Sequence, residues 1–449
     1  MLSKLKNNSG FAHLSQLKYL LWLLTLAASM HFYVFKWDNA IVIFILLVAN
    51  FLLIVTKGRL VISLVALSAF LIHVASNFPR IDNHANLELL YLLNIFIGFY
   101  IFRKGKAVAL QDFIRLSTIV FAFCIYFFAG FHKLNHDFLN PLVSCVNFIN
   151  STLGNIFNAS EQTIINISKL SQWLTLLTEL VLPFGLFNYR TRLVAAFGIA
   201  LFHIYISFAG LANFGSFGIV LLLFSVIPIE KLNAESKNIR KYASIGFIAI
   251  LTLYTLQKFN IYISYRLFAQ GLIFNIGILL LMQLMFKNQA RLNKVSIKHW
   301  SVVIFIFILL TFWSMKAYIG LGNTGNLTMF SNIITDSNKS NHLFINTRYT
   351  KLTHLEEDQV YVLKIDSILK RQNATLRIDG MYIPKTELAY RIASAKGNQT
   401  GTNGGIFIEN KDTVIVNDLM QSKFADCKWW YRFISFRAIQ PNGPNRCRW

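Results

Sequence analysis

Charged residues are scarce in this chain of 449 residues, of which Asp, Glu, Lys and Arg together make up only 14%. Soluble domains of ordinary composition carry about 25%. Apolar residues make up 55% of the chain, and 41 residues are phenylalanine. The length alone would suggest two or three soluble domains. The composition argues against them and predicts a polytopic membrane protein.

Acidic residues are fewer still, with 20 Asp and Glu against 43 Lys and Arg, which gives a formal net charge of +23. In a soluble chain this excess would indicate nucleic-acid binding. Here the basic residues lie largely in short loops between apolar runs, where retention on the cytoplasmic side explains them. We therefore expect the lipid bilayer as a partner, and no nucleic acid.

The chain has only four cysteines. Cys124 and Cys145 lie in or beside the fifth apolar run, and Cys427 and Cys447 lie near the C-terminus. The second pair is a candidate disulfide if that region faces an oxidising compartment. Free thiols are the alternative.

Eleven apolar runs organise the first three quarters of the chain. Each holds roughly 17–21 residues, enough to cross a hydrocarbon core of about 30 Å as a helix. The first run follows a long basic region without a clean cleavage site, so we expect an uncleaved span. The runs lie near residues 15–35, 40–56, 59–76, 86–102, 113–131, 170–187, 193–209, 213–230, 243–258, 267–286 and 299–318.

The loops between these runs are basic on alternate sides. With the N-terminus in the cytoplasm, most Lys and Arg fall inside, as the positive-inside tendency requires. An odd number of spans places the C-terminus outside. We therefore predict an all-α bundle of about 11 transmembrane helices, N-in and C-out. The Ile, Lys, Asn and Phe usage suggests an AT-rich bacterial genome and thus the inner (cytoplasmic) membrane.

The composition changes after Gly320, which predicts a transmembrane domain at 10–320 and a small extracytoplasmic α+β domain at 321–449. This second domain contains no His/Cys metal spacing, no GxSxG and no phosphate-binding glycine loop, so we expect no metal site. Its predicted elements are strands at Val360–Ile365, Thr375–Ile378, Gly405–Ile408 and Val414–Val416, a helix near 385–395 and an aromatic run at Trp429–Tyr431.

The strongest local string is AGFHKLNHDFL, residues 129–139, which ends the fifth run and enters an outer loop. Ala129-Gly130 permits close helix packing, so Lys133 one turn later is expected to be partly sheltered from water. A sheltered lysine loses its proton more readily and can then act as a base. A lysine that reaches up to lipid headgroups is the alternative.

Two histidines are expected at the same membrane face. His84 follows Asp82 and Asn83 in the outer connection before the fourth run, where a satisfied loop histidine is the alternative reading. His203 falls in the outward half of the seventh run, where an ionisable group suggests function. Glu179 lies within the sixth run, and a protonated carboxyl bonded to a neighbouring helix is its simplest interpretation.

These strings resemble the HTTM (horizontally transferred transmembrane) family, and within it the vitamin K-dependent γ-glutamyl carboxylases. AGFHKLNHDFL matches their AG-x-x-KL-x-x-D/E-x-[LV] stretch, and DNHANLELLYLL is similar to their Asn-His segment. TELVLPFGLFNYRTRLVAAFGIALFHIYIS resembles their paired later helices with a Phe-His. The likeness covers about residues 10–320 in hydropathy and order, but only about 60 residues in recognisable motif.

The resemblance implies a catalytic role for Lys133 as the base, with His84 beside it and His203 as a buried histidine. In the family, the base deprotonates reduced vitamin K, whose reaction with dioxygen generates a stronger base. That base removes a γ-proton from glutamate, and the carbanion captures carbon dioxide. The implied cofactors are reduced vitamin K or another quinol, with O₂ and CO₂. The implied substrate is a protein or peptide on the extracytoplasmic side.

The chain also departs from the carboxylases. His132 stands where they have a second lysine, and the region after residue 320 is much shorter than their lumenal part. A non-enzymatic membrane scaffold or receptor that presents the C-terminal domain outside is therefore the alternative function. A transporter is less favoured, because no inverted repeat or pair of Gly/Pro-broken helices is evident.

Overall fold

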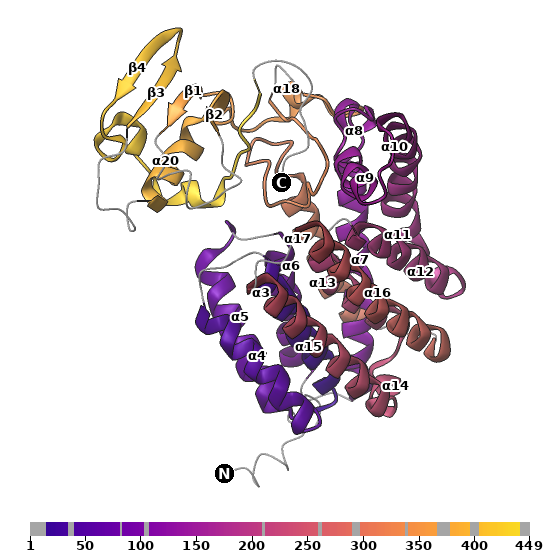
Figure 1. The fold of residues 1–449 in the computed structure, drawn as a ribbon. Helices are drawn as coiled ribbons and strands as arrows, with labels where there is room; N and C mark the ends of the chain where they lie inside the picture. Colours follow the sequence, from indigo (N-terminus) through magenta and orange to yellow (C-terminus); the bar gives the residue numbers. More distant parts are fainter. Residues whose placement is uncertain are drawn as a thin grey trace. The chain divides into compact units, whose positions relative to one another are not determined.

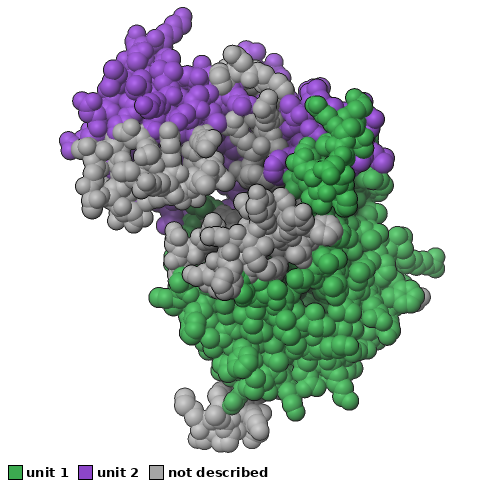
Figure 2. All heavy atoms as spheres, viewed as in Figure 1, with its two compact units in different colours: residues 1–127, 149–164, 173–310 green, residues 128–148, 165–172, 311–449 purple. Residues whose placement is uncertain are grey.

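The chain is mostly helical, with a small antiparallel sheet near the C-terminus. Its computed structural model divides into two compact units, coloured separately in Figure 2. Unit 1 comprises residues 1–127, 149–164 and 173–310, and unit 2 comprises residues 128–148, 165–172 and 311–449. The structure describes residues 15–34, 40–80, 83–102, 107–208, 212–258, 263–289, 297–336, 340–365, 378–395 and 404–440.

Unit 1 is built from helices, which Figure 1 labels in chain order. Two of these helices, α7 and α17, end in unit 2. The main elements are α3 (Lys18–Val34), α4 (Ala40–Val55), α5 (Leu60–Asn77), α6 (Asn83–Phe102), α7 (Ala107–His132), α9 (Cys145–Ile156), α10 (Glu161–Leu176), a π-helix (Leu177–Val181), α11 (Leu182–Gly185), α12 (Tyr189–Ile206), α13 (Ala212–Val226), α14 (Ile229–Ala234), α15 (Ser236–Lys258), α16 (Ile263–Asn288) and α17 (Ile297–Met315).

The described part of every apolar run predicted from the sequence is mostly helical. Four helical stretches in the described part are long and apolar enough to cross a membrane, at Leu60–Asn77, Asn83–Phe102, Val108–His132 and Gly271–Asn288. Shorter apolar helices include His299–Met315. These helices indicate a membrane protein, whereas the count of eleven spans and the orientation remain predictions.

The outer faces of these helices are apolar. On α17, Phe305 is 62% exposed, Ile308 59% and Phe312 56%. Large apolar side chains on a surface helix would face water at considerable cost in a soluble protein, whereas acyl chains accommodate them.

Polar side chains inside unit 1 bind one another across neighbouring helices. The hydroxyls of Tyr91 on α6 and Thr118 on α7 are 2.6 Å apart. One turn further along α6, Asn94 donates to Ser117 Oγ at 2.9 Å. Interhelical hydrogen bonds of this kind satisfy groups that lipid cannot. They fix the register of α6 against α7.

Unit 2 contains an antiparallel sheet in the order β2-β1-β3-β4 (Figure 1). The strands are β1 (Gln359–Ile365), β2 (Met381–Pro384), β3 (Gly405–Glu409) and β4 (Asp412–Val416). The helix α20 (Lys385–Ala395) contributes Leu388 and Ile392 to a core that also holds Val360, Val362 and Phe407.

Three of the predicted strands and the predicted helix at 385–395 are confirmed. The fourth predicted strand, Thr375–Ile378, lies almost wholly outside the described residues, and its described end, Ile378, is not in a strand. The strand β2 was not predicted, because it is short and ends at Pro384, a residue that cannot donate to a ladder. The aromatic run at 429–431 lies in a 3₁₀-helix, Trp429–Phe433.

The boundary between the units differs from the predicted one at residue 320. Residues 128–148 and 165–172 belong with the C-terminal part in unit 2. The Asn135 and His342 backbones form an antiparallel bridge. The end of α7 is therefore part of the unit that holds the sheet.

The predicted disulfide between Cys427 and Cys447 is wrong, because Cys427 forms no disulfide. Cys447 lies outside the described residues. Cys145 is disulfide-bonded, and Cys124 is free and buried in α7. The spacing of the two C-terminal cysteines misled the prediction, because sequence proximity carries no information on which sulfur atoms meet in the fold.

Candidate functional site

Lys133 directly follows the last turn of α7 and is sheltered, as the sequence predicts. The residue is 3% exposed. Its backbone N–H donates to Gly130 O at 3.0 Å, and its Nζ turns back to Ala129 O at 3.2 Å. Because Ala129 and Gly130 are small, the Lys133 side chain has room to fold back along the helix toward Ala129 O. The amine therefore lies at the end of a candidate membrane span, away from water.

His132, the preceding residue, fastens the end of α7 to the end of α17. Its Nδ1 lies 2.8 Å from Tyr318 Oη, and its Nε2 lies 2.8 Å from Ser314 Oγ. The imidazole is fully buried. A neutral imidazole has one donor and one acceptor, so one of the two hydroxyls accepts a hydrogen bond from the ring and the other donates one to it. No local pattern singles out this contact, because the partners of His132 lie more than 180 positions away in the sequence.

Asn135 and His342 are buried polar residues of unit 2 that bind the backbone at the end of α7. Asn135 is fully buried, donates to His132 O at 2.8 Å and accepts from Phe138 N at 2.8 Å. His342 Nδ1 accepts from the backbone N–H groups of Phe344 and Ile345, and its Nε2 lies 3.1 Å from Phe131 O. An Nδ1 that accepts cannot carry a proton. His342 is therefore neutral with its hydrogen on Nε2, in agreement with the burial that lowers its pKa.

His203 on α12 forms a buried pair with Tyr126 on α7 in unit 1. Its Nε2 lies 2.7 Å from Tyr126 Oη, and the histidine is 5% exposed. Its other nitrogen, Nδ1, is buried and has no hydrogen-bond partner among the described residues. A buried polar atom without a protein partner is a candidate contact for a bound polar group.

Two glycines of α13 leave room for the side chains of Tyr126 and His203, because a glycine has no Cβ. A Cβ at Gly215 would lie 2.8 Å from His203 Nδ1, and one at Gly218 would lie 3.1 Å from His203 Nε2 and press against Tyr126 Oη. Any side chain at either position would displace the imidazole or the phenol. The sequence showed the glycines but not what they face.

Acidic and basic groups lie within electrostatic range of the pair. His84 interacts with His203, and Glu179 interacts with Tyr126. Glu179 is 4% exposed and lies in the π-helix Leu177–Val181. Short π-helical segments occur frequently at functional sites.

The structure corrects the predicted place of His84. It lies in the first turn of α6 and is 6% exposed, not in a loop. Of the three predicted catalytic residues, His84 and His203 both belong to unit 1 and lie within electrostatic range of each other. Lys133 belongs to unit 2, with His132, Asn135 and His342.

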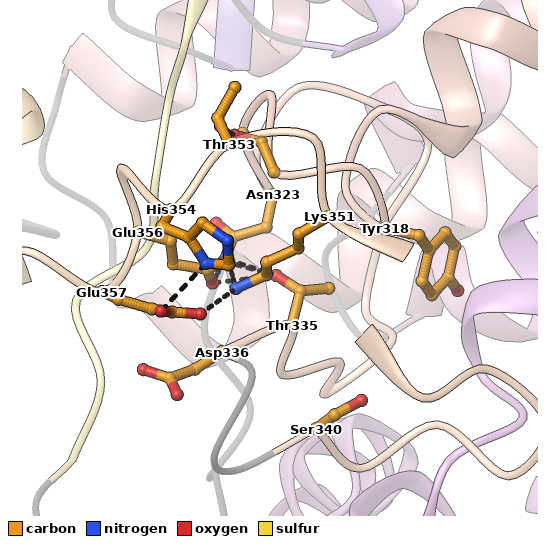
Figure 3. Close-up of polar contacts among 12 residues, drawn as sticks. Tyr318, Asn323, Thr335, Asp336, Ser340, Lys351, Thr353, His354, Glu356 and Glu357 are labelled. Carbon is orange, nitrogen blue, oxygen red and sulfur yellow. Dashed lines mark hydrogen bonds and ion pairs between the residues drawn. The ribbon is translucent and has the colours of Figure 1, made fainter. Parts of the chain in front are cut away.

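A second buried polar cluster in unit 2 is an ion pair between Lys351 and Glu356 (Figure 3). Their charged atoms are 3.0 Å apart, and both side chains are fully buried. Glu356 also accepts hydrogen bonds from Asn323 and Thr335, each at 2.8 Å. The carboxylate is thus fully used within the protein. We interpret the cluster as structural.

Metal ligation has no support in the described part of the chain, where no group of three or more His, Cys, Asp or Glu side chains could hold an ion. No family model matches the chain, no curated protein matches it, and no solved structure matches it.

The contact between α13 and the Tyr126–His203 pair makes a first prediction. Gly218→Ala is expected to destabilise the protein by about 1–3 kcal/mol, because the added methyl group overpacks the pair. Gly277→Ala on α16 is the matched control, since a Cβ there would meet nothing within 4 Å. It should be neutral or stabilise by up to about 1 kcal/mol. Denaturant unfolding of both variants in detergent checks this, and equal stabilities would contradict the packing described for α13.

Proposed function

We propose that the chain is a multi-pass membrane enzyme that uses a reduced quinone and dioxygen at the extracytoplasmic face, as its resemblance to the vitamin K-dependent carboxylases implies. One observation carries this proposal. Lys133 is an almost fully buried amine at the end of an apolar helix, where its Nζ donates to Ala129 O. An amine in such a place can exchange a proton with a lipid-soluble hydroxyl compound.

The residues fit a quinol by their chemistry. A quinol brings two hydroxyl groups on an apolar ring, and its oxidation by dioxygen supplies the driving force to remove a weakly acidic C–H proton. Lys133 would accept the hydroxyl proton. Considered by itself within unit 1, the buried Nδ1 of His203 meets no hydrogen-bond partner among the described residues and is suited to hold a polar oxygen atom of a bound molecule. Burial of these groups excludes water from the reacting atoms.

The predicted topology has one independent support. Cys145 lies in the segment between α7 and α10 and is disulfide-bonded. Disulfides persist in oxidising compartments, which favours an extracytoplasmic position for this segment. The proposed orientation puts the same segment outside, in a chain that we propose crosses a bacterial inner membrane eleven times, N-in and C-out. A protein or peptide substrate and carbon dioxide would then be met on the outer side.

The experiment that tests the proposal measures dioxygen uptake by the purified full chain in lipid nanodiscs. Reduced vitamin K and reduced menaquinone are supplied in turn. We expect uptake above the protein-free rate with at least one reduced quinone and none with the oxidised forms. Uptake equal to the protein-free rate with every reduced quinone would remove the enzymatic proposal.

A non-enzymatic scaffold is the second candidate, favoured by the separate core of the sheet and α20. Deletion of residues 325–449 does not distinguish the two functions. The deletion would also remove Ser331 and His342, which hydrogen-bond to Asn135 and Phe131 beside Lys133. Point variants at Lys133 leave these contacts in place, so they separate an enzyme from a scaffold.

A further inference from the structure

Residues 343–352, which we name the apolar loop, expose several large apolar side chains in unit 2. Phe344 is 75% exposed, Tyr349 79% and Leu352 76%, and Leu343 is 37% exposed. Single exposed apolar residues are common, but a group within one short segment indicates a contact surface. Arg348, in the same segment, is also exposed.

The first end of the apolar loop is fixed beside the end of α7. Leu343 N donates to Leu134 O at 2.9 Å, and His136 N donates to Asn341 O at 3.1 Å. Leu134 is the second residue after α7, whose residues 108–132 form a candidate membrane span. Leu343 and Phe344 therefore lie at the level where this helix leaves the membrane.

The other end of the apolar loop is fixed beside the end of α17. Leu352 N donates to Ile319 O at 3.0 Å, and Thr350 Oγ1 donates to Tyr318 O at 2.7 Å. Near the end of that helix, Lys316 Nζ lies 4.4 Å from the ring centre of Trp313. Lys316 is buried and its Nζ also reaches Phe433 O at 3.5 Å, so these contacts fix the end of α17 inside unit 2.

Buried contacts turn the apolar side chains outward. Thr347 is fully buried. Lys351, between Thr350 and Leu352, directs its amine inward to Glu356, and its side chain is fully buried. With these residues fixed inside, Tyr349 and Leu352 face outward. The loop is thus attached to unit 2 at both ends and by the buried Thr347 and Lys351 between them.

We propose that the apolar loop is a membrane-inserting element that places Phe344, Tyr349 and Leu352 in the headgroup and upper acyl region of the lipid leaflet at the Lys133 end of α7. The partner is phospholipid, because both anchors of the loop lie within four residues of an apolar helix end. Aromatic and aliphatic side chains with a nearby cation suit that layer, where Arg348 can meet the phosphates.

This proposal does not depend on quinone chemistry, and its test uses no enzymatic readout. Phe344→Cys and Tyr349→Cys are labelled with an NBD fluorophore in the full chain carrying Cys427→Ser, which removes the more exposed of the two described cysteines that form no disulfide. Ile415→Cys is the matched control, since Ile415 is 71% exposed on β4. The labelled proteins are reconstituted in phosphatidylcholine vesicles with and without doxyl-labelled lipid.

We expect labels at 344 and 349 to lose fluorescence with doxyl lipid and to resist aqueous iodide, and the label at 415 to show the reverse. Iodide quenching at 344 and 349 equal to that at 415 would overturn the proposal. Shielding from iodide without quenching by doxyl lipid would also overturn it, because the surface would then be covered by protein. Equal doxyl quenching at all three positions would overturn the assignment to this loop.

Discussion

Replacing Lys133 with methionine is expected to lower quinol-dependent dioxygen uptake by about 10²–10⁴-fold, the range that a positioned acid or base contributes. Methionine keeps the length and apolar character of the lysine stem at a site that is 3% exposed, but it lacks the amine. Lys133→Arg keeps the positive charge, yet a guanidinium does not release its proton in proteins. We expect the arginine variant to lose activity as well, as a base requires.

The matched control is Lys169→Met, which removes an exposed lysine of the same unit. It should retain the wild-type rate. Circular dichroism and the unfolding midpoint establish that each variant is folded. If Lys133→Arg kept its activity, Lys133 would supply charge only. If Lys133→Met kept its activity, the proposed base would be wrong.

Replacing Lys351 with methionine is expected to destabilise unit 2 by about 3–5 kcal/mol, because it leaves a buried carboxylate without its cation. The two charged atoms are 3.0 Å apart, and neither side chain is exposed. Asn323 and Thr335 would still donate to Glu356, so part of its stabilisation remains. Denaturant unfolding monitored by tryptophan fluorescence measures the loss.

The loss of stability in Lys351→Met is expected to depend on pH. Burial is the largest effect on Glu356 and raises its pKa in the folded protein. A carboxyl whose pKa is raised by folding binds its proton more tightly in the folded protein. Its contribution to the free energy of unfolding is therefore present below the pKa of the unfolded state and is lost as pH rises through the pKa of the folded state. The difference in the free energy of unfolding between Lys351→Met and wild type should therefore be smaller at acidic pH than at neutral pH.

A second substitution supplies the control for the ion pair. The double variant Lys351→Met/Glu356→Gln should recover much of the lost stability, because it removes the buried charge and keeps acceptor and donor atoms for Asn323 and Thr335. A double variant as unstable as Lys351→Met would show that the loss arises from packing and not from the unpaired charge.

The helices could be predicted from the sequence because their signal is local. An apolar run of sufficient length favours a helix in lipid whatever surrounds it, and the described part of every such run is mostly helical here. The limits of α20 at 385 and 395 were also predictable, since its first residue follows Pro384. The shelter of Lys133 followed from the small residues one turn before it.

The buried side-chain pairs and the division into two units could not be predicted, because they depend on contacts between distant parts of the chain. Tyr126 meets His203 across 77 positions, and His132 meets Tyr318 across 186. No local pattern encodes such pairs. His84 was placed in a loop because polar neighbours resemble a turn, although the helix α6 already begins at Asn83. The inclusion of residues 128–148 in unit 2 likewise depends on long-range pairing.

The most direct test of the proposed reaction supplies ¹⁸O-labelled dioxygen and a reduced quinone to the full chain and analyses the quinone products by mass spectrometry. If Lys133 serves as the base of a carboxylase-like enzyme, the wild-type chain forms a quinone epoxide that carries ¹⁸O, and Lys133→Met forms none. The account is contradicted if the wild-type chain yields only unlabelled quinone, or if Lys133→Met forms the labelled epoxide at the wild-type rate.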